Sequence, residues 1–326
     1  MVRRIVCREL AGPEAMRLEE VPAPPLGPGQ VRVAVRAAGV NFPDILMTYG
    51  KYQLRPPLPF TPGVEAAGDV VECAADVSGV RVGDQVITKH RVGGYTDEIV
   101  LAAADTHPLP PGFDYAEGAC FMVGYHTAYH GLVQRGQVGP GQVLLVHGAA
   151  GGVGLGAVEI GKLLGATVIA TGSRDDKLAV VKARGADHVI NYVSDNFRER
   201  VKELTDGRGA DVIYDPVGGD VFDESLRCIA WNGRLLVVGF AGGRIPAAPA
   251  NLALLKGCAV VGVRAGEFGR RNPAAAKANQ RALLDWAAAG KLKPHISHRL
   301  PLERFAEAMA VLSDRKAVGR VALLAR

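Results

Sequence analysis

The sequence is poor in cysteine, and the few cysteines it has are scattered. The five thiols form an odd set and no two of them make a CxxC pair. This distribution is typical of separate thiols in a reducing compartment rather than of a disulfide framework, and it disfavours a structural zinc site. The five residues are Cys7, Cys73, Cys120, Cys228 and Cys258.

Long runs of like charge and long apolar runs are also missing. The 38 Lys and Arg residues nearly balance 33 Asp and Glu, and no run of five basic residues occurs, so the net charge of +5 does not indicate a nucleic-acid partner. No stretch of about 18 apolar residues is long enough to span a bilayer, and charges follow closely on the short apolar stretch at the amino terminus. We therefore expect a cytoplasmic protein with no membrane partner.

The chain does contain enough apolar residues for two cores. Its 326 residues are 48% hydrophobic, which favours two domains and excludes a largely disordered chain. In the first third, short alternating stretches are separated by Pro/Gly-rich connectors, which predicts a small barrel-like β domain. The predicted strands cover residues 31–36, 67–73, 85–88 and 98–101.

Strands and helices alternate from residue 143 onward, which predicts an α/β fold with a doubly wound parallel sheet. A helix over 115–133 is expected before this series and a long helix over 274–289 after it. We expect 258–263 to be an edge strand of the sheet and the last strand, 319–324, to fold back on the amino-terminal domain. The series comprises strands 143–147, 167–171, 188–190, 212–215, 234–239 and 258–263 and helices 153–164, 175–184, 196–204 and 221–229.

A glycine-rich turn joins the first strand of this series to its helix. Ala149, Gly151 and Gly154 occupy the three positions of a dinucleotide-binding fingerprint, with alanine in place of the first glycine. Gly151 would let the backbone approach a pyrophosphate, Gly154 would let helix and strand pack closely, and the helix amides, at Gly152 and Val153, would face the phosphates. Because strand, helix and further βα units surround the motif, we predict a dinucleotide site rather than only a tight turn.

The end of the second strand of the series indicates which dinucleotide is bound. An enzyme that uses NAD normally presents Asp or Glu there to the ribose hydroxyls. This chain has Gly172, Ser173 and Arg174, followed by Lys177, with Tyr192 after the next strand. A hydroxyl, two cations and a phenol would hold a ribose phosphate, so we predict NADPH. The alternative is that the two cations are solvated charges on a helix that also carries two acids.

Short glycine-containing segments extend over essentially the whole chain, at residues 39–44, 50–52, 62–68, 80–86, 93–96, 149–154 and 185–187. With these segments the chain resembles the zinc-free medium-chain dehydrogenase/reductases, specifically the NADPH:quinone oxidoreductase (zeta-crystallin-like) group. The resemblance implies a GroES-like β-rich catalytic domain of residues 1–122 and 266–326 around an inserted Rossmann NADP-binding domain of residues 123–265. It also implies an active site in the cleft between the domains, and a homodimer.

The zinc alcohol dehydrogenases of this superfamily have a Cys shortly after the first strand and a His before the Glu of a Gly-His-Glu motif. This chain has Val40 and Asn41, and then Val64, at the corresponding places. Two of the three protein ligands of a catalytic zinc site are thereby missing, so we expect no metal. His126 and His130 are spaced to share an ion on a helix, but no third ligand is identifiable, and we expect both to be packing residues.

Without a metal or a Ser-His or Cys-His unit, we expect hydride transfer from NADPH to a quinone or an α,β-unsaturated carbonyl. The resemblance implies that Asn41 and Tyr52 are hydrogen-bond donors at the acceptor, although Tyr52 is alternatively a packed loop aromatic. Quinone-reducing relatives often carry a second tyrosine where this chain has Leu46, with Tyr49 nearby. Linear enones and enoyl thioesters therefore stay open as acceptors.

Four further cofactor contacts follow from the resemblance alone. Thr127 is expected near the nicotinamide, Gly239 and Phe240 near its carboxamide, and Arg320 near the phosphates. Arg264 either lines the substrate cleft or belongs to a subunit interface. A non-catalytic NADPH-binding protein is the alternative from a different class, because a fold that binds a cofactor need not turn it over.

Overall fold

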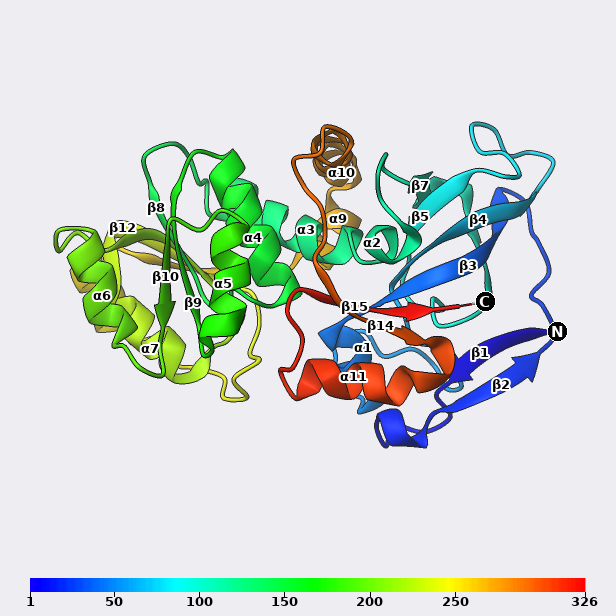
Figure 1. Cartoon of the computed structure of the whole chain (residues 1–326), viewed down its shortest axis with the longest axis horizontal. Coiled ribbons are helices and arrows are strands. Elements are labelled where there is room, and N and C mark those ends of the chain that lie inside the picture. Colours follow the sequence, from blue (N-terminus) through cyan, green and yellow to red (C-terminus); the bar gives the residue numbers. More distant parts are fainter. Residues whose placement is uncertain (326) are drawn as a thin grey trace. The chain divides into compact units, whose positions relative to one another are not determined.

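The computed structural model describes residues 1–325, and the chain forms two compact units. Unit 1 consists of Met1–Val123 and the segment from Lys293 onward, and unit 2 consists of Gly124–Leu292. Each unit has its own large sheet (Figure 1). Residues 266–292 thus belong to unit 2, whereas the sequence had placed them in the first domain.

Helix packing explains the different boundary. Within unit 2, α9 (Ala265–Arg271) and α10 (Pro273–Ala288) lie against the π-helix η3 (His130–Arg135). The His130 ring stacks on Phe268 at 4.3 Å between centroids and bonds Gln134 at 2.6 Å, so this histidine has the packing role expected for it. The amides of Gln134 and Asn279 exchange hydrogen bonds of 2.7 and 3.1 Å, which fastens α10 to unit 2.

Unit 1 is built on a seven-stranded sheet in the order β14-β15-β3-β4-β5-β7, in which β6 also pairs with β3. All neighbouring pairs are antiparallel except β14 with β15. The four strands predicted in the first third are confirmed, with longer bounds. The strands are β3 (Gln30–Val40), β4 (Glu65–Cys73), β5 (Gln85–Lys89), β6 (Glu98–Ala102), β7 (Thr106–Pro108), β14 (Ile296–Pro301) and β15 (Arg320–Leu324).

The last strand folds back as predicted. β15 runs antiparallel to β3, with Val321 opposite Val40 and Leu324 opposite Ala37. Its residues from Arg320 to Leu323 are buried, so the end of the chain completes the core of its first part.

Unit 1 also contains an amino-terminal hairpin and several short helices. The hairpin and the helix that begins at Phe42 were not predicted, whereas the sequence does predict a helix over 302–312, and the structure has one there. The hairpin pairs β1 (Val2–Val6) with β2 (Arg17–Val21), and it was missed because Arg3 and Arg4 interrupt the apolar pattern of β1. The helices are α1 (Phe42–Thr48), α2 (Tyr115–Ala119) and α11 (Phe305–Ser313), with 3-10 turns η1 (Pro13–Ala15), η2 (Ala103–Asp105) and η4 (Leu302–Arg304).

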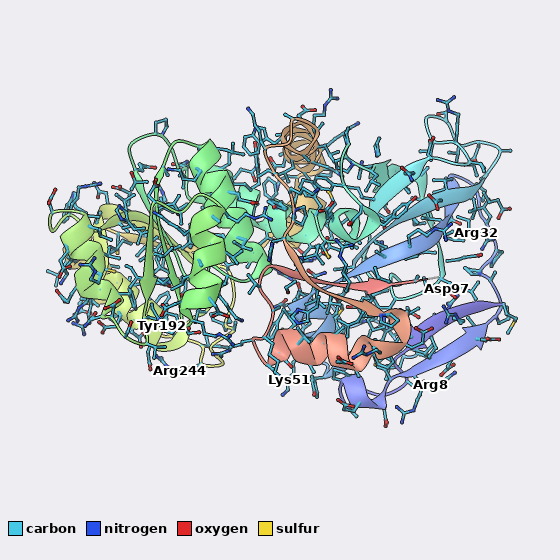
Figure 2. The ribbon with its side chains drawn as sticks, in the orientation of Figure 1. Arg8, Arg32, Lys51, Asp97, Tyr192 and Arg244 are labelled. Atoms are coloured by element: carbon cyan, nitrogen blue, oxygen red, sulfur yellow. The ribbon has the colours of Figure 1, made fainter. Side chains whose placement is uncertain are left out.

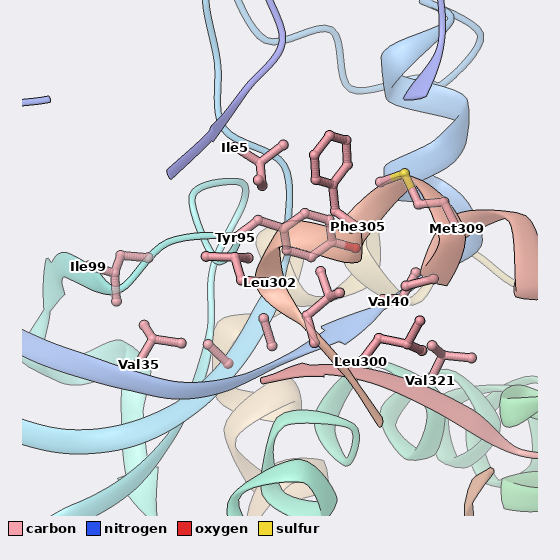
Figure 3. Packing of buried hydrophobic residues seen from close by; sticks show 14 of the residues in the cluster. Ile5, Val35, Val40, Tyr95, Ile99, Leu300, Leu302, Phe305, Met309 and Val321 are labelled. Atoms are coloured by element: carbon pink, nitrogen blue, oxygen red, sulfur yellow. The ribbon is translucent and has the colours of Figure 1, made fainter. Parts of the chain in front are cut away.

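The core of unit 1 lies between the main sheet, the hairpin and α11. Val31, Val33 and Val35 of β3 alternate toward the core, and after a register shift between Val35 and Ala37 the strand again contributes Val40 to it. Phe305 and Met309 of α11 point to the same core (Figure 3). Tyr95 lies fully buried among them. The period-two burial along β3 is the pattern expected of a strand with one face on a core.

Unit 2 contains the predicted parallel sheet, in the order β10-β9-β8-β11-β12-β13, and every pair is parallel. Among the described residues β13 is an edge strand, as predicted. The strands are β8 (Val143–Val146), β9 (Thr167–Gly172), β10 (His188–Asn191), β11 (Ala210–Asp215), β12 (Ile229–Val237) and β13 (Ala259–Gly262).

Helices cover both faces of this sheet, with α4 and α5 on one side and α6 and α7 on the other (Figure 1). The single helix predicted over 115–133 was wrong: α2 ends at its cap, Cys120, and α3 and the π-helix η3 follow as separate elements. In residues 1–325 no helix has the length and hydropathy needed to cross a membrane. The remaining helices are α3 (Met122–Tyr129), α4 (Gly152–Leu163), α5 (Asp175–Ala183), α6 (Phe197–Leu204), α7 (Gly219–Cys228) and α8 (Ala250–Lys256).

The turn between β8 and α4 tolerates no side chain at Gly154. A Cβ atom there would lie 2.4 Å from the Gly148 carbonyl oxygen and 2.7 Å from the Ala149 Cα, so Gly154→Ala must push the helix from the strand. We expect this variant to lose about 1–3 kcal/mol of unfolding free energy, as overpacking does. Gly139→Ala, with nothing within 4 Å of the new Cβ, is the matched control in urea denaturation. Equal stability of the two variants would contradict the close approach.

Candidate functional site

The strand order of the unit 2 sheet reverses between β8 and β11. Ligands of such sheets bind outside the carboxyl ends of the strands at this point. Gly148, with φ of 55°, turns the chain there, and a Cβ on it would lie 3.2 Å from the Val217 side chain and 3.4 Å from that of Pro216. The glycine-rich turn therefore lies directly beside the loop that follows β11.

Gly151 and Gly154 differ in what surrounds their α-carbons. A Cβ on Gly154 would collide with backbone, whereas a Cβ on Gly151 would meet only the Gly148 oxygen, at 3.3 Å. Gly151 precedes the first turn of α4, which contains the half-buried Gly152 and Val153 and whose amides suit an anion. Ala149 is fully buried, and its amide donates to the Thr171 carbonyl at 3.1 Å.

The residues predicted around the ribose phosphate come together at the end of β9. Gly172 is the last residue of β9, and a Cβ on it would lie 2.9 Å from a methyl group of Leu178, so glycine lets α5 pack closely. The Tyr192 amide donates to the Gly172 carbonyl at 3.0 Å. Ser173 is exposed, and Arg174 is the N-cap of α5.

The two cations of this group have different surroundings. Lys177 is buried, with 9% of its surface exposed, and burial lowers the pKa of its ammonium group, which the nearby Arg174 lowers further. Arg174 is exposed and makes a two-point ion pair with Asp176, at 2.7 and 3.0 Å. Asp175 accepts a hydrogen bond from the Asn191 amide. No carboxylate lies at the end of β9 itself, but the Asp176 carboxylate pairs with Arg174 and also attracts the ammonium group of Lys177.

Gly239 and Phe240 follow β12 and are tied to the loop after β11. The Gly239 amide donates to the Asp215 carbonyl, and the Phe240 side chain is 39% exposed. The Asp215 side chain is buried, accepts the Val217 and Gly218 amides at 2.8 and 2.9 Å, and has a pKa raised by burial. Sequence reasoning did not single out Asp215, although an acid at the end of a buried strand was a usable signal.

His147 at the end of β8 is a second residue that the sequence reasoning missed. Its ring is buried and contacts Thr171 Oγ1 through Nδ1 and Ser225 Oγ through Nε2, both at 2.8 Å. Because the Ser225 hydroxyl already donates to the Val221 carbonyl at 2.6 Å, Nε2 carries the proton and Nδ1 accepts from Thr171. Burial lowers the pKa of His147 to about 3, so the ring is neutral.

Unit 1 contains a buried polar cluster that includes two predicted site residues. Arg320 and Glu65 form an ion pair, with exposed fractions of 8% and 0%. Although burial alone would lower the pKa of Arg320, the Glu65 carboxylate raises it above its ordinary value. Arg320 Nη2 also donates to Asn41 Oδ1 at 2.8 Å, and Glu65 accepts the Val123 amide. Glu65 and Asn41, two side-chain partners of Arg320, thus both belong to unit 1.

Asn41 has both ends of its amide occupied in this cluster. Its Nδ2 donates to Glu65 at 3.0 Å and to the Gly39 carbonyl at 3.3 Å, and only 2% of the residue is exposed. Asn41 could donate to another acceptor only by giving up one of these bonds.

Asp44 extends the cluster, and the sequence reasoning gave neither it nor Glu65 a role. The Asp44 carboxylate accepts hydrogen bonds from the backbone N–H of Asn41, at 2.9 Å, and from the Tyr95 hydroxyl, at 3.1 Å. Its burial raises the pKa of the carboxyl to about 7. The spacing Asn41-x-x-Asp44 is that of a helix capping box, which the structure contains, so this part of the cluster had a readable signal.

Tyr52 is half-buried and packs against the unit 1 core. The alternative Tyr49 is 44% exposed, and Lys51 Nζ lies 5.5 Å from its ring. Leu46 is half-buried on α1. Thr127, in unit 2, is half-buried on α3.

The two positions where zinc alcohol dehydrogenases carry zinc ligands are occupied here by residues of the apolar core of unit 1. Val40 is a buried member of the core and Val64 packs against it. Within residues 1–325 no group of three or more His, Cys, Asp or Glu is arranged to hold a metal ion.

Because His147 is buried and neutral, we expect the stability of the protein to depend on pH. The unfolded chain binds a proton at this residue below about pH 6.5, while the folded chain binds it only below about pH 3, so acid favours unfolding in this window. Between pH 6.5 and 5.0 His147 should remove about 2 kcal/mol of unfolding free energy. In urea denaturation at both pH values, the loss of unfolding free energy should be smaller by about this amount in His147→Gln than in the parent protein and in His188→Gln, whose histidine is exposed. His90 contributes to the loss in all three proteins, because burial lowers its pKa to about 4. A loss of the same size in His147→Gln would contradict the assignment.

Two protein-family profiles match the chain. The family profile described as the alcohol dehydrogenase GroES-like domain matches residues 27–112, and the profile described as zinc-binding dehydrogenase matches residues 152–281. The first match lies in unit 1 and the second in unit 2.

Whole-length relatives agree with these matches. The quinone oxidoreductase-like protein 2 homolog of Nematostella vectensis is 41% identical over 98% of this chain and 88% of its own length. The quinone oxidoreductase of Pseudomonas syringae pv. Tomato DC3000 has a TM-score of 0.91 at 33% identity, with 99% of this chain and 100% of that chain covered. The Escherichia coli quinone oxidoreductase, solved with NADPH, has a TM-score of 0.89 at 28% identity, with 99% of each chain covered. On this evidence the chain belongs to the medium-chain dehydrogenase/reductases and, within them, to the quinone oxidoreductase group.

Proposed function

We propose that this protein is an NADPH-dependent oxidoreductase that transfers hydride to quinones or other α,β-unsaturated carbonyl compounds without a metal. The observation that supports the proposal is the end of β9, where backbone hydrogen bonds tie Ala149 of the glycine-rich turn to Thr171 and Tyr192 to Gly172, and where no acid ends the strand. We assign Ser173, Lys177 and Tyr192 to the ribose phosphate on this basis. The similar structures from Pseudomonas syringae and Escherichia coli are both quinone oxidoreductases, and the second was solved with NADPH, which supports the same chemistry here.

The residues of unit 2 fit a dinucleotide phosphate. The open side of Gly151 lets a pyrophosphate approach the amides of the first turn of α4, and the end of β9 supplies cations for a ribose phosphate. Bound there, NADPH supplies a hydride. The remaining work of the chain is to orient the cofactor and stabilise negative charge on the acceptor oxygen.

Tyr52 is the donor that we assign to the acceptor oxygen. The family resemblance points to the Tyr52 phenol, and the Asn41 amide gives both of its protons to Glu65 and Gly39. In this assignment Asn41 and the Glu65–Arg320 pair keep the local backbone in place. The half-buried Leu46 stands where relatives often carry a tyrosine, and it favours less polar acceptors, so linear enones and enoyl thioesters are the second candidate class.

An acceptor panel tests the proposal. NADPH oxidation is followed with a small quinone, a linear enone and an enoyl thioester, on protein whose zinc content has been measured. Turnover of at least one acceptor without stoichiometric zinc is expected. Tight NADPH binding with no turnover of any acceptor would instead favour a non-catalytic NADPH-binding protein.

Coenzyme choice depends on Lys177 in this proposal. A charge-assisted hydrogen bond is worth about 1.5–3 kcal/mol, so Lys177→Ala should raise the KM for NADPH about ten- to a hundredfold. The KM for NADH should barely change, because NADH lacks the phosphate. Lys182→Ala, an exposed lysine of the same helix, is the matched control. Equal use of NADH and NADPH by the parent protein would overturn the assignment.

Substitution of Asp176 should change the KM for NADPH in the opposite direction to Lys177→Ala. Asp176→Asn removes the partner of Arg174 and frees its guanidinium for the phosphate. Because exposed ion pairs contribute at most about 1 kcal/mol, the KM for NADPH should fall by up to about fivefold.

Tyr52→Phe tests the donor assignment. Loss of a hydrogen bond made in the transition state should lower kcat about tenfold or more and leave NADPH affinity nearly unchanged. Tyr49→Phe, in which an exposed phenol is removed, should retain activity. Unchanged kinetics of Tyr52→Phe on every acceptor would place Tyr52 among the packing residues.

Dimerisation through β13 is the expected assembly. Val260 of this edge strand is 39% exposed, and the neighbouring helix α8 exposes Leu254 and Leu255 by 79% and 68%. An apolar edge with unpaired amides favours pairing with its own copy. Light scattering at micromolar concentration should give twice the chain mass for the parent and for the control Val82→Lys, and the chain mass for Val260→Lys. A monomeric parent would contradict the prediction.

A further inference from the structure

A groove in unit 1 is lined by none of the residues assigned to the cofactor or to the acceptor. It has a volume of about 420 Å³ and runs between the β1–β2 hairpin, the proline-rich segment 56–61 and the turn at residues 92–93. Its walls are mostly apolar, including Val6, Val21 and Phe60, and its charged lining residues are Arg4, Arg8 and Glu19. Figure 2 labels Arg8 on the hairpin. The volume is in the range of small-molecule sites.

The charges of the groove do not cancel. Two arginines and one glutamate leave a net charge of +1. Glu19 lies opposite Arg4 in the hairpin register, but its carboxylate is held at two points by Arg8, with distances of 2.8 and 2.7 Å. The acid nearest to Arg4 in the register is therefore taken by another cation.

Arg4 has no such partner. Its Nε atom is buried without a hydrogen-bond partner, and no carboxylate within residues 1–325 forms an ion pair with it. Burial is the cause that lowers the pKa of Arg4, with no acid to oppose it. A guanidinium in this setting remains charged, and because no carboxylate pairs with it, its positive charge in the groove is not compensated. The neighbouring Arg3, in contrast, is bonded to Asp97 at two points.

We propose that this groove binds the carboxylate of an amphipathic small molecule, such as a medium-chain fatty acid, with Arg4 on the carboxylate and the apolar walls on the chain. The planar guanidinium suits a two-oxygen acceptor, and Val6, Val21 and Phe60 provide the surface that an alkyl chain would cover. Neither a neutral lipid nor a cation has both features.

Isothermal titration calorimetry of the full-length protein with decanoate tests the proposal. Saturable binding of decanoate is expected, with binding at least tenfold weaker for decanol, for the decyltrimethylammonium cation and for acetate. Decanol and the ammonium probe the need for the carboxylate, and acetate probes the need for the chain. Absence of saturable binding of decanoate up to 1 mM would overturn the proposal, and so would equal binding of decanol.

Two variants with opposite expected effects locate the site. Arg4→Gln should weaken decanoate binding about tenfold or more, whereas Glu19→Gln, which removes the acid from the groove, should tighten it severalfold. Arg81→Gln, an exposed arginine of unit 1, is the control and should bind as the parent does. Unchanged NADPH affinity and an unchanged melting temperature exclude misfolding of each variant. If Arg4→Gln kept the parent affinity in a folded protein, the site would lie elsewhere and the proposal would fail.

Discussion

The buried ion pair of Glu65 and Arg320 is the constraint on which unit 1 depends. It joins β4 to the last strand, 255 positions apart in the chain, in surroundings that exclude water. A buried charge without its partner is strongly destabilising, so neither residue can be buried unless both chain ends have folded together. Asn41 and the Val123 amide also bond to the pair, whereas Arg320 Nε is buried without a hydrogen-bond partner. The cluster thus specifies the start of α1 and the start of α3 as well as the pairing of β15 with β3.

Unit 2 uses charge differently. At the end of β9 the closely packed Gly172 and the buried stem of Lys177 place a cation beside a strand end without an acid, while Arg174 is balanced by an exposed aspartate. Lys177 is desolvated and has a lowered pKa, so an anion that binds there regains electrostatic interaction that water no longer supplies. Arg174 is exposed and makes a two-point ion pair with Asp176, which a phosphate would first have to displace, whereas Lys177 is buried and is also attracted by Asp176. In the proposed phosphate site the two cations would therefore contribute unequally.

The sequence predicted the parts of the structure whose signals are local. Every strand of the unit 2 sheet and every strand of the unit 1 sheet except β7 was predicted, as were the fold-back of the last strand and the turn from Gly148 to Gly154, because periodicity and glycine spacing are read within a few residues. The hairpin β1–β2 was missed because adjacent arginines hide its pattern, and the break at Cys120 because the capping of α2 interrupts a continuous apolar pattern. Contacts such as Arg320 with Glu65 have no local signature. The resemblance could indicate that Arg320 matters but not what it binds.

Asn41 shows how such a contact changes the interpretation of a residue. Sequence resemblance alone suggests that its amide faces the substrate, yet its two protons go to Glu65 and Gly39 and its oxygen receives Arg320. A side-chain amide can both donate to a buried carboxylate and accept from the guanidinium paired with it. Aspartate would add a second negative charge beside Glu65, and leucine would leave both partners with unmet hydrogen bonds. The ion pair itself therefore favours asparagine over these two residues at this position, before any substrate is considered.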